Sequence, residues 1–250
     1  MRVIWTTFAK HPDTLPVHLA NVQKLIELGH VHEVHVWHEA TRELASVIST
    51  RVSLFPFSHK REYYAHYTRE AYPSHIIIHA LDDIVYIDCD HFPEFINHRK
   101  ALEHPLLYAN IINHGTCIMQ QQASGLINLD IAKHDALYGK LWKSGDLAER
   151  LHSTFIDNMA EWHARARMQP VRVHKSRFGL HFFAITSRDL DIFRACKNNI
   201  DDEAELTYFN PLETGKYNAI DLSFIVSHLS FSKQDFDKRA VLQKYISKMN

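Results

Sequence analysis

Two pairs of acids, each placed directly after an apolar run, constrain this chain more than any other feature of its sequence. Asp82 and Asp83 follow an isoleucine-rich stretch, and Asp88 and Asp90 follow the apolar stretch 84–87. Open α/β sheets bind ligands outside the carboxyl ends of their strands. Because Mg²⁺ and Mn²⁺ take oxygen ligands and commonly bridge to phosphates, the segment predicts a metal-assisted phosphate or nucleotide site.

The rest of the chain alternates between the hydrophobic periods of strands and helices. Strands are expected over 2–8, 33–37, 51–55, 76–80 and 106–113, and helices over 14–29, 39–48, 60–71, 93–102, 146–164 and 233–249. Such alternation is typical of a mostly parallel sheet flanked by helices. No linker, repeat or low-complexity tract is visible, so a single α/β domain over residues 1–250 is expected.

Composition excludes several classes of function. The 28 Lys and Arg nearly balance the 29 Asp and Glu, so the chain lacks the basic field on which sequence-independent nucleic-acid binding depends. None of the seven glycines forms a GxGxxG or GKS/T arrangement, which argues against a dinucleotide-binding dehydrogenase and a P-loop enzyme. The twenty histidines are scattered, and abundance without convergent geometry does not make a ligand set.

Cysteine usage and hydropathy indicate the compartment. Cys89, Cys117 and Cys196 are widely separated, odd in number and without a CxxC pair, which is typical of reduced thiols. No stretch approaches the roughly 18 apolar residues of a membrane span. A soluble cytoplasmic protein without a transmembrane segment is therefore expected.

Three segments resemble a known family. The stretch IIIHALDDIVYIDCDHFPEFINHRK (76–100) resembles the DxD region of GT-A glycosyltransferases, in particular a group with a DDDIVYI stretch. LLYANIIN (106–113) is similar to the ANVVN strand of that group, and residues 200–231 resemble its acidic segment and terminal HFAF histidine. The resemblance implies a GT-A-like fold, with a Rossmann-like nucleotide-binding half over about 1–115 and an acceptor half over about 116–250.

The resemblance also implies a metal site. In GT-A enzymes the DxD carboxylates hold a divalent ion, Mn²⁺ or Mg²⁺, that bridges the diphosphate of a nucleotide sugar. The three family acids fall on Leu81, Asp82 and Asp83, so the first acid is lost here and Asp83 becomes the expected metal ligand. A second register places the motif on Asp88 and Asp90. Asp is also a common turn former, and Asp90 or its neighbour could cap the helix expected from residue 93.

Further site residues are carried over by position. The late histidine corresponds to His228, a second metal ligand or a partly buried strand histidine. Asp202 and Glu203 match an acidic pair that supplies the general base, unless this acid run is a solvated loop. Asp221 is the next candidate for the base, since it lies shortly before His228. The expected nucleotide-sugar contacts are Asp82, Lys60, Asn110, Asn113 and Lys216.

The sequence therefore predicts a metal-dependent glycosyltransferase that moves a sugar from a nucleotide-sugar donor to a hydroxyl of a glycan, lipid or small-molecule acceptor. A nucleotidyltransferase is the first alternative, although its usual Gly-rich or basic phosphate loop is not visible near residues 2–16. A non-catalytic GT-A-like nucleotide-binding domain is the second alternative, because Leu81 replaces an acid.

Overall fold

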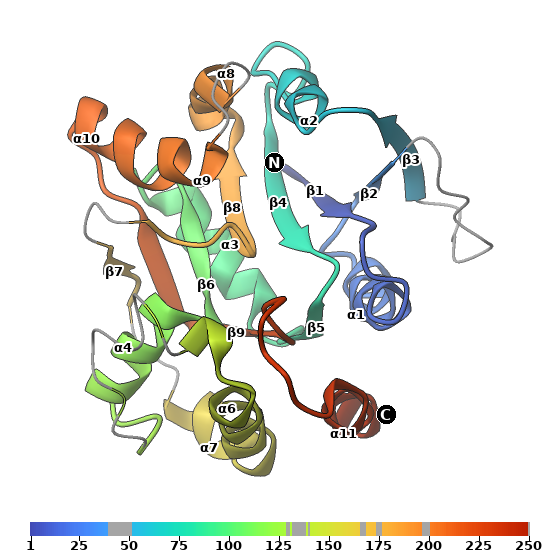
Figure 1. Cartoon of the computed structure of the whole chain (residues 1–250). Helices are drawn as coiled ribbons and strands as arrows, with labels where there is room; N and C mark the ends of the chain where they lie inside the picture. The colour runs from blue at the N-terminus through green and yellow to red at the C-terminus, as the bar shows by residue number, and fades with distance from the viewer. Residues whose placement is uncertain are drawn as a thin grey trace.

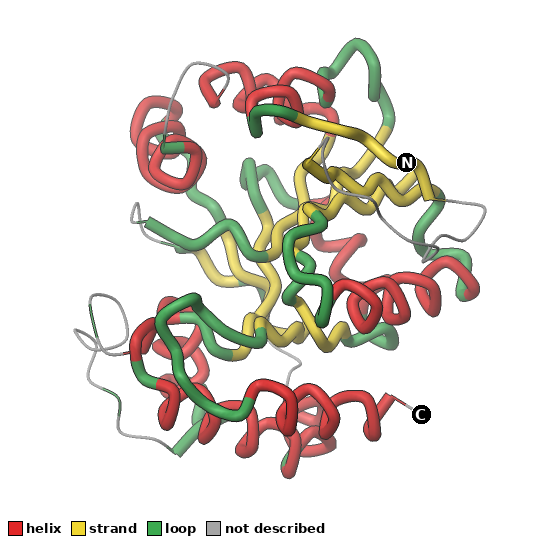
Figure 2. Tube along the Cα trace, turned by 45° about the vertical axis from the view of Figure 1, so that its right-hand side comes forward, coloured by secondary structure: helices red, strands yellow, loops and turns green. Residues whose placement is uncertain are grey.

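The structure, a computed structural model, describes residues 1–39, 52–128, 131, 139, 141–165, 169–173, 177–196 and 201–249. Over these ranges one nine-stranded sheet with the order β3-β2-β1-β4-β8-β6-β9-β5 forms the centre of the molecule, and β7 pairs with β9 outside this path. Figure 2 shows the sheet crossing the centre of the molecule, with helices on either side of it.

The strands are short and mostly buried. Their bounds are β1 Arg2–Phe8, β2 Glu33–Glu39, β3 Val52–Phe57, β4 His75–Leu81, β5 Ile84–Ile87, β6 Leu107–Ile112, β7 Val171–Arg172, β8 Phe182–Thr186 and β9 Ala219–His228. β1, β2, β3, β4, β6 and β9 run in one direction, and β5, β7 and β8 run against them. The prediction of an α/β fold with a mostly parallel sheet flanked by helices is confirmed.

The helical elements cover both faces and both ends of the sheet. Their bounds are α1 Leu15–Glu27, α2 Arg61–His66, α3 Phe92–Ala101, α4 Gly115–Ala123, η1 Leu141–Lys143, α6 Gly145–Asp157, α7 Met159–Arg165, η2 Ser187–Ile192, α8 Phe193–Cys196, α9 Asp202–Ala204, η3 Glu205–Phe209, α10 Asn210–Thr214 and α11 Lys238–Met249. In Figure 1, α6, α7 and α11 gather at the lower end, and α2, α8, α9 and α10 at the upper end.

Two apolar clusters hold these layers together. The larger one joins the first strands to α1, α3 and α2, and it contains stacked aromatic rings such as Phe95 and Phe224, whose centroids are 4.5 Å apart. The smaller one lies between β5, β6 and β9 and the helices α6, α7 and α11, with Phe155 and Tyr245 fully buried. Burial of apolar area at about 25 cal/mol per Å² is the main force that holds α11 against β5 and α6.

Most of the expected elements are present, and the differences lie at their ends. The helix expected over 39–48 falls almost wholly outside the described residues. The helix expected over 60–71 ends at His66, because Tyr67 adopts extended backbone with φ −89° and ψ 96°. The helix over 146–164 is divided at Asn158. The final helix begins at Lys238 rather than at residue 233, and Asp237 accepts a hydrogen bond from the Ala240 N–H at 2.9 Å.

Among the described helices, none combines the length and the apolar composition needed to cross a membrane.

Candidate functional site

Asp83 and His228 come together at one end of the sheet. Asp83 lies in the turn between β4 and β5, and His228 is the last residue of β9. The antiparallel pairing of β5 with β9 places Ile84 opposite His228, and the Leu229 N–H donates to the Asp83 carbonyl at 2.9 Å. The carboxylate Oδ2 of Asp83 then lies 3.2 Å from Nε2 of His228. Two residues distant in sequence are thus fixed together by strand register.

A cavity of about 920 Å³ opens beside this pair. One wall is formed by the loop after β1 and another by the segment 229–232 and the start of α11. The cavity is lined by His11, Asp13, Thr14, Leu81, Asp83, His181, His228, Leu229, Ser230, Phe231, Ser232, Lys238, Arg239, Leu242 and Gln243. The cavity therefore combines two carboxylates, two buried imidazoles and two cationic side chains, a set suited to a metal ion and an anionic ligand.

Two further histidines extend the pair into the protein. The ring of His181 lies 4.1 Å from that of His228, and the ring of His114 lies 5.4 Å from that of His181, centroid to centroid. Burial, together with the nearby His228, holds the pKa of His181 well below its ordinary value. Burial likewise lowers the pKa of His114 to about 3. Both rings are therefore neutral at pH 7, and a neutral ring nitrogen can bind a metal ion.

The Asp83 and His228 side chains suit a bound cation. Burial by itself would raise the pKa of Asp83, but the interaction with His228 outweighs it and lowers that pKa, so Asp83 is ionised at pH 7. Within the described part of the chain, Asp83 Oδ1 and His228 Nδ1 are buried and have no hydrogen-bond partner. Buried polar atoms are normally satisfied, and one carboxylate with imidazole is an adequate set for Mn²⁺ or Mg²⁺ completed by other oxygen ligands.

Asp82 has a different environment from its neighbour Asp83. Its Oδ2 accepts hydrogen bonds from the Lys10 and His11 N–H groups, both at 2.6 Å, and its Oδ1 lies 2.8 Å from His11 Nδ1. The hydrogen bond to Asp82 raises the pKa of His11 above its ordinary value. Asp82 thus fixes the loop between β1 and α1, which forms one wall of the cavity.

The predicted base residues do not line this cavity. Asp202 forms an ion pair with Lys60, another predicted site residue, and accepts a hydrogen bond from the Tyr64 hydroxyl at 2.5 Å. Burial would raise the pKa of Asp202, but Lys60 outweighs this effect and lowers it. Glu203 accepts from Arg177 Nε at 3.0 Å. These contacts place both acids beside α2 and residue 177, and their catalytic role stays a prediction.

Asn110 lies within the sheet. Its Nδ2 donates to the Leu222 carbonyl at 3.3 Å, and its Oδ1 accepts from Gln121 Nε2 at 2.7 Å. Lys216 is half exposed and lies 3.9 Å from Asp189 Oδ1. Neither residue is among those that line the cavity beside Asp83.

Asn113 anchors the segment that follows β9. It adopts a positive φ of 62° and exchanges two hydrogen bonds with the side-chain amide of Gln234, at 2.9 and 3.0 Å. Gln234 Nε2 also donates to the Leu141 carbonyl at 2.7 Å. Gly145 packs against the same segment, since a Cβ there would lie 1.7 Å from the Asp235 carbonyl oxygen. Through Gln234, Asn113 therefore fixes the segment that forms one wall of the cavity.

The second register, Asp88 with Asp90, lies beyond the other end of β5. Asp88 is buried, and its Oδ1 accepts from the His91 N–H at 3.2 Å. Asp88 and Asp90 line a separate cavity of about 510 Å³. Asp221 was expected on the same rim as His228, and this is wrong. It lies near the start of β9, where it accepts from the Ser223 N–H at 3.0 Å and pairs with His98 at 2.6 Å.

Sequence reasoning missed five ionisable residues of the cavity: His11, Asp13, His181, Lys238 and Arg239. His181 precedes an apolar strand in the stretch GLHFFAIT, much as several other histidines of this chain flank strands. Lys238 and Arg239 lie at the start of α11, and the sequence pattern of this helix indicated only its apolar face. No spacing links these residues to Asp83, because the fold alone brings them to it.

No family model matches this chain, and no curated protein sequence matches it. Solved structures match over nearly the whole chain at low identity. A 4-diphosphocytidyl-2C-methyl-D-erythritol synthase from Anaerococcus prevotii DSM 20548 has a TM-score of 0.47 and 6% identity, covering 100% of this chain and 96% of that chain. The galactosyltransferase LgtC, solved with donor and acceptor sugar analogues, has a TM-score of 0.43 and 9% identity, covering 99% and 96%. These values are too low to assign an activity.

Proposed function

We propose that this chain is a metal-dependent glycosyltransferase that moves a sugar from a nucleotide-sugar donor to a hydroxyl acceptor. The observation that carries the proposal is the pairing of Asp83 with His228, 3.2 Å apart, in the wall of a cavity that also contains Lys238 and Arg239. Buried oxygen and nitrogen atoms beside two cations are what a metal-bound diphosphate requires. The resemblance of residues 76–100 to a DxD region supports the same activity.

Each group of residues has a proposed role. Asp83 and His228 would hold Mn²⁺ or Mg²⁺, which supplies positive charge to the departing nucleoside diphosphate. Lys238 and Arg239 would contact the phosphate oxygens from the opposite wall and stabilise the same developing charge. Asp82 would act indirectly, because its hydrogen bonds keep the loop at Lys10 and His11 in place.

The acceptor hydroxyl must lose its proton to a base as it attacks the anomeric carbon. Asp202 and Glu203 remain candidates from the sequence resemblance. The structure favours Asp13, an exposed carboxylate that lines the cavity on the side of the β1 to α1 loop. A base has to lie within hydrogen-bond reach of the hydroxyl, and Asp13 shares its cavity with Asp83 whereas Asp202 does not.

The test is an incubation of the full chain with Mn²⁺ and a panel of UDP-, GDP-, CDP- and dTDP-sugars. We expect one of them to release nucleoside diphosphate, and Asp83→Asn to abolish that release. Asp90→Asn is the matched control, since it removes the same charge from an exposed residue of the second register. Loss of activity in Asp90→Asn but not in Asp83→Asn would contradict the assignment of the metal ligands.

Two other activities are distinguished by a second incubation with nucleoside triphosphates and sugar phosphates. A nucleotidyltransferase would transfer the nucleotidyl group of the triphosphate to the sugar phosphate and release pyrophosphate. A binding domain without activity would give a metal-dependent thermal shift with nucleotide but no turnover of any donor. Either result would refute sugar transfer while leaving the metal and diphosphate site intact.

A further inference from the structure

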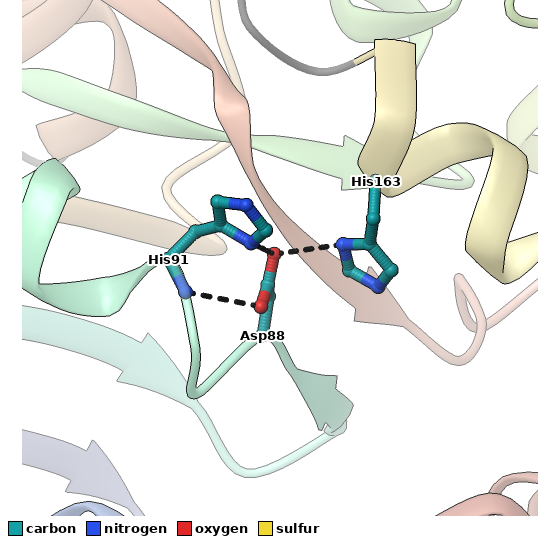
Figure 3. A group of neighbouring side chains, drawn as sticks. All are labelled: Asp88, His91 and His163. Carbon is teal, nitrogen blue, oxygen red and sulfur yellow. Dashed lines mark hydrogen bonds and ion pairs between the residues drawn. The ribbon is translucent and has the colours of Figure 1, made fainter.

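A second cluster of potential metal ligands lies away from the Asp83 cavity. Asp88, His91 and His163 each offer one atom, and these three atoms all lie within 4.8 Å of one another. Asp88 follows β5, His91 directly precedes α3, and His163 belongs to α7. Figure 3 shows both imidazoles turned toward the one carboxylate.

The distances within the cluster are close to those of a coordination shell. Asp88 Oδ2 lies 2.8 Å from His91 Nδ1 and 3.1 Å from His163 Nδ1. Two atoms bound to Zn²⁺ at about 2.0 to 2.1 Å with tetrahedral angles are roughly 3.3 Å apart. The two rings are parallel within 4°, with centroids 5.4 Å apart. The two imidazole atoms lie within 4.8 Å of each other, so a rearrangement of the two rings about Asp88 would admit an ion.

The environment of His163 also suits a metal ion. Its Nδ1 is buried and lies 3.1 Å from Asp88 Oδ2, and it has no other hydrogen-bond partner among the described residues. Its other nitrogen, Nε2, lies 3.0 Å from the Tyr86 hydroxyl. When Nε2–H donates to an oxygen, Nδ1 keeps the lone pair that a metal needs, as metal-ligating histidines commonly do through their outer-shell partners.

We propose that Asp88, His91 and His163 form a divalent transition-metal site of the Zn²⁺ class, separate from the site at Asp83. Two imidazoles with one carboxylate favour Zn²⁺, whereas Mg²⁺ and Ca²⁺ prefer shells built from oxygen. The side chains of His91 and His163 are 32% and 25% exposed, so an ion can enter from solvent. The bound ion joins α7 to the carboxyl end of β5.

The site is independent of the proposed transferase activity. Asp83 and Asp88 flank the four residues of β5, so they are separated by roughly 16 Å of extended chain. Neither His91 nor His163 lines the cavity beside Asp83. The experiment therefore uses an Asp83→Asn parent, in which the first site has lost its carboxylate.

Zn²⁺ is titrated into this parent in competition with a fluorescent chelator. We expect one Zn²⁺ per chain, with affinity reduced at least about 10-fold in His91→Asn and in His163→Gln. His59→Asn removes an exposed histidine outside the cluster and should leave the affinity unchanged. Equal Zn²⁺ affinity in the parent and in both cluster variants, or no Zn²⁺ bound by the parent, would overturn the proposal.

Two additional measurements distinguish loss of the metal site from misfolding of a variant. Tyr86→Phe removes only the hydroxyl beside His163 Nε2 and should weaken Zn²⁺ binding by about 10-fold or more without a change in the circular dichroism spectrum. Co²⁺ in place of Zn²⁺ should give the visible absorption of a tetrahedral site in the parent and lose it in His91→Asn. An unchanged Co²⁺ spectrum in His91→Asn would place the ion elsewhere and refute the site.

Discussion

Asn113 and Gln234 face each other amide to amide, each donating one hydrogen bond to the other, at 2.9 and 3.0 Å. Asn113 directly follows β6, and Gln234 belongs to the segment between β9 and α11. This buried pair fixes the segment that forms one wall of the cavity beside Asp83. Its removal should therefore affect both the stability and the shape of the site.

Gln234→Ala is expected to lower the free energy of unfolding by about 2 to 4 kcal/mol, because it leaves buried amide and carbonyl groups of its partners without hydrogen bonds. Gln23→Ala, on the surface of α1, should change it by less than about 0.5 kcal/mol. Urea unfolding of both variants measures the difference. Similar stabilities would show that the pair does not hold the segment.

Nucleotide binding should depend on a divalent ion. Asp83 is ionised and buried, so it would repel a diphosphate unless a cation lies between them. UDP or GDP should raise the melting temperature in Mn²⁺ or Mg²⁺ but not in EDTA, and at 100 times its dissociation constant it would contribute about 2.7 kcal/mol. Equal shifts in EDTA would contradict the metal bridge.

The contribution of the cationic side chains to diphosphate binding can be tested with two lysines of α11. Lys238→Ala should weaken the binding of nucleoside diphosphate about 10- to 150-fold, because a hydrogen bond between charged groups contributes about 1.5 to 3 kcal/mol. Lys244→Ala removes the same charge from an exposed position of α11 that does not line the cavity. Isothermal titration should show weakened binding in the first variant alone, with the effect reduced at high salt.

Asp13→Asn and Asp202→Asn separate the two candidates for the base. The variant of the true base should keep metal-dependent donor binding while turnover falls by about 10² to 10⁴. We expect this result for Asp13→Asn. For Asp202→Asn we expect lower stability instead, since Lys60 and Tyr64 lose their charged partner. The reverse pattern in turnover would restore the assignment drawn from the sequence.

Acid should destabilise the fold through its buried histidines. Burial lowers the pKa of His152 to about 4, and that of an unfolded histidine is about 6.5. The unfolded chain therefore binds more protons between these values, and stability falls as the pH drops through this window by about 1.4 kcal/mol per unit for each such histidine.

His152→Gln should reduce the loss of stability between pH 7 and pH 5 by about 2 kcal/mol. The comparison of two pH values within one variant removes the effect of the substitution on packing. His59→Gln, at an exposed position, should leave the pH difference unchanged. An unaltered pH difference in His152→Gln would show that this ring is already protonated or exposed.

The sequence was sufficient for the layers of the fold because hydrophobic periods report which face of each element is buried. It also predicted Asp83 and His228 as partners, through their resemblance to family motifs. It could not predict the ion pair of Lys60 with Asp202, because this is a tertiary contact between the residue that precedes α2 and the first residue of α9. The resemblance separated Asp83, the expected metal ligand, from Asp82, but it did not predict the hydrogen bonds of Asp82 to the loop at Lys10 and His11, because those are tertiary contacts.

The placement of β9 has a consequence for how the protein is assembled. β9 is the last strand in the chain, yet it inserts between β6 and β5, and in the described sheet β5 pairs with β9 alone. The earlier strands must therefore leave a gap that stays open until nearly all of the chain is available. Long-range pairings of this kind form slowly. A chain shortened before Ala219 would lose both the pairing partner of β5 and His228, so the sheet edge and the Asp83 site depend on the same late segment of the chain.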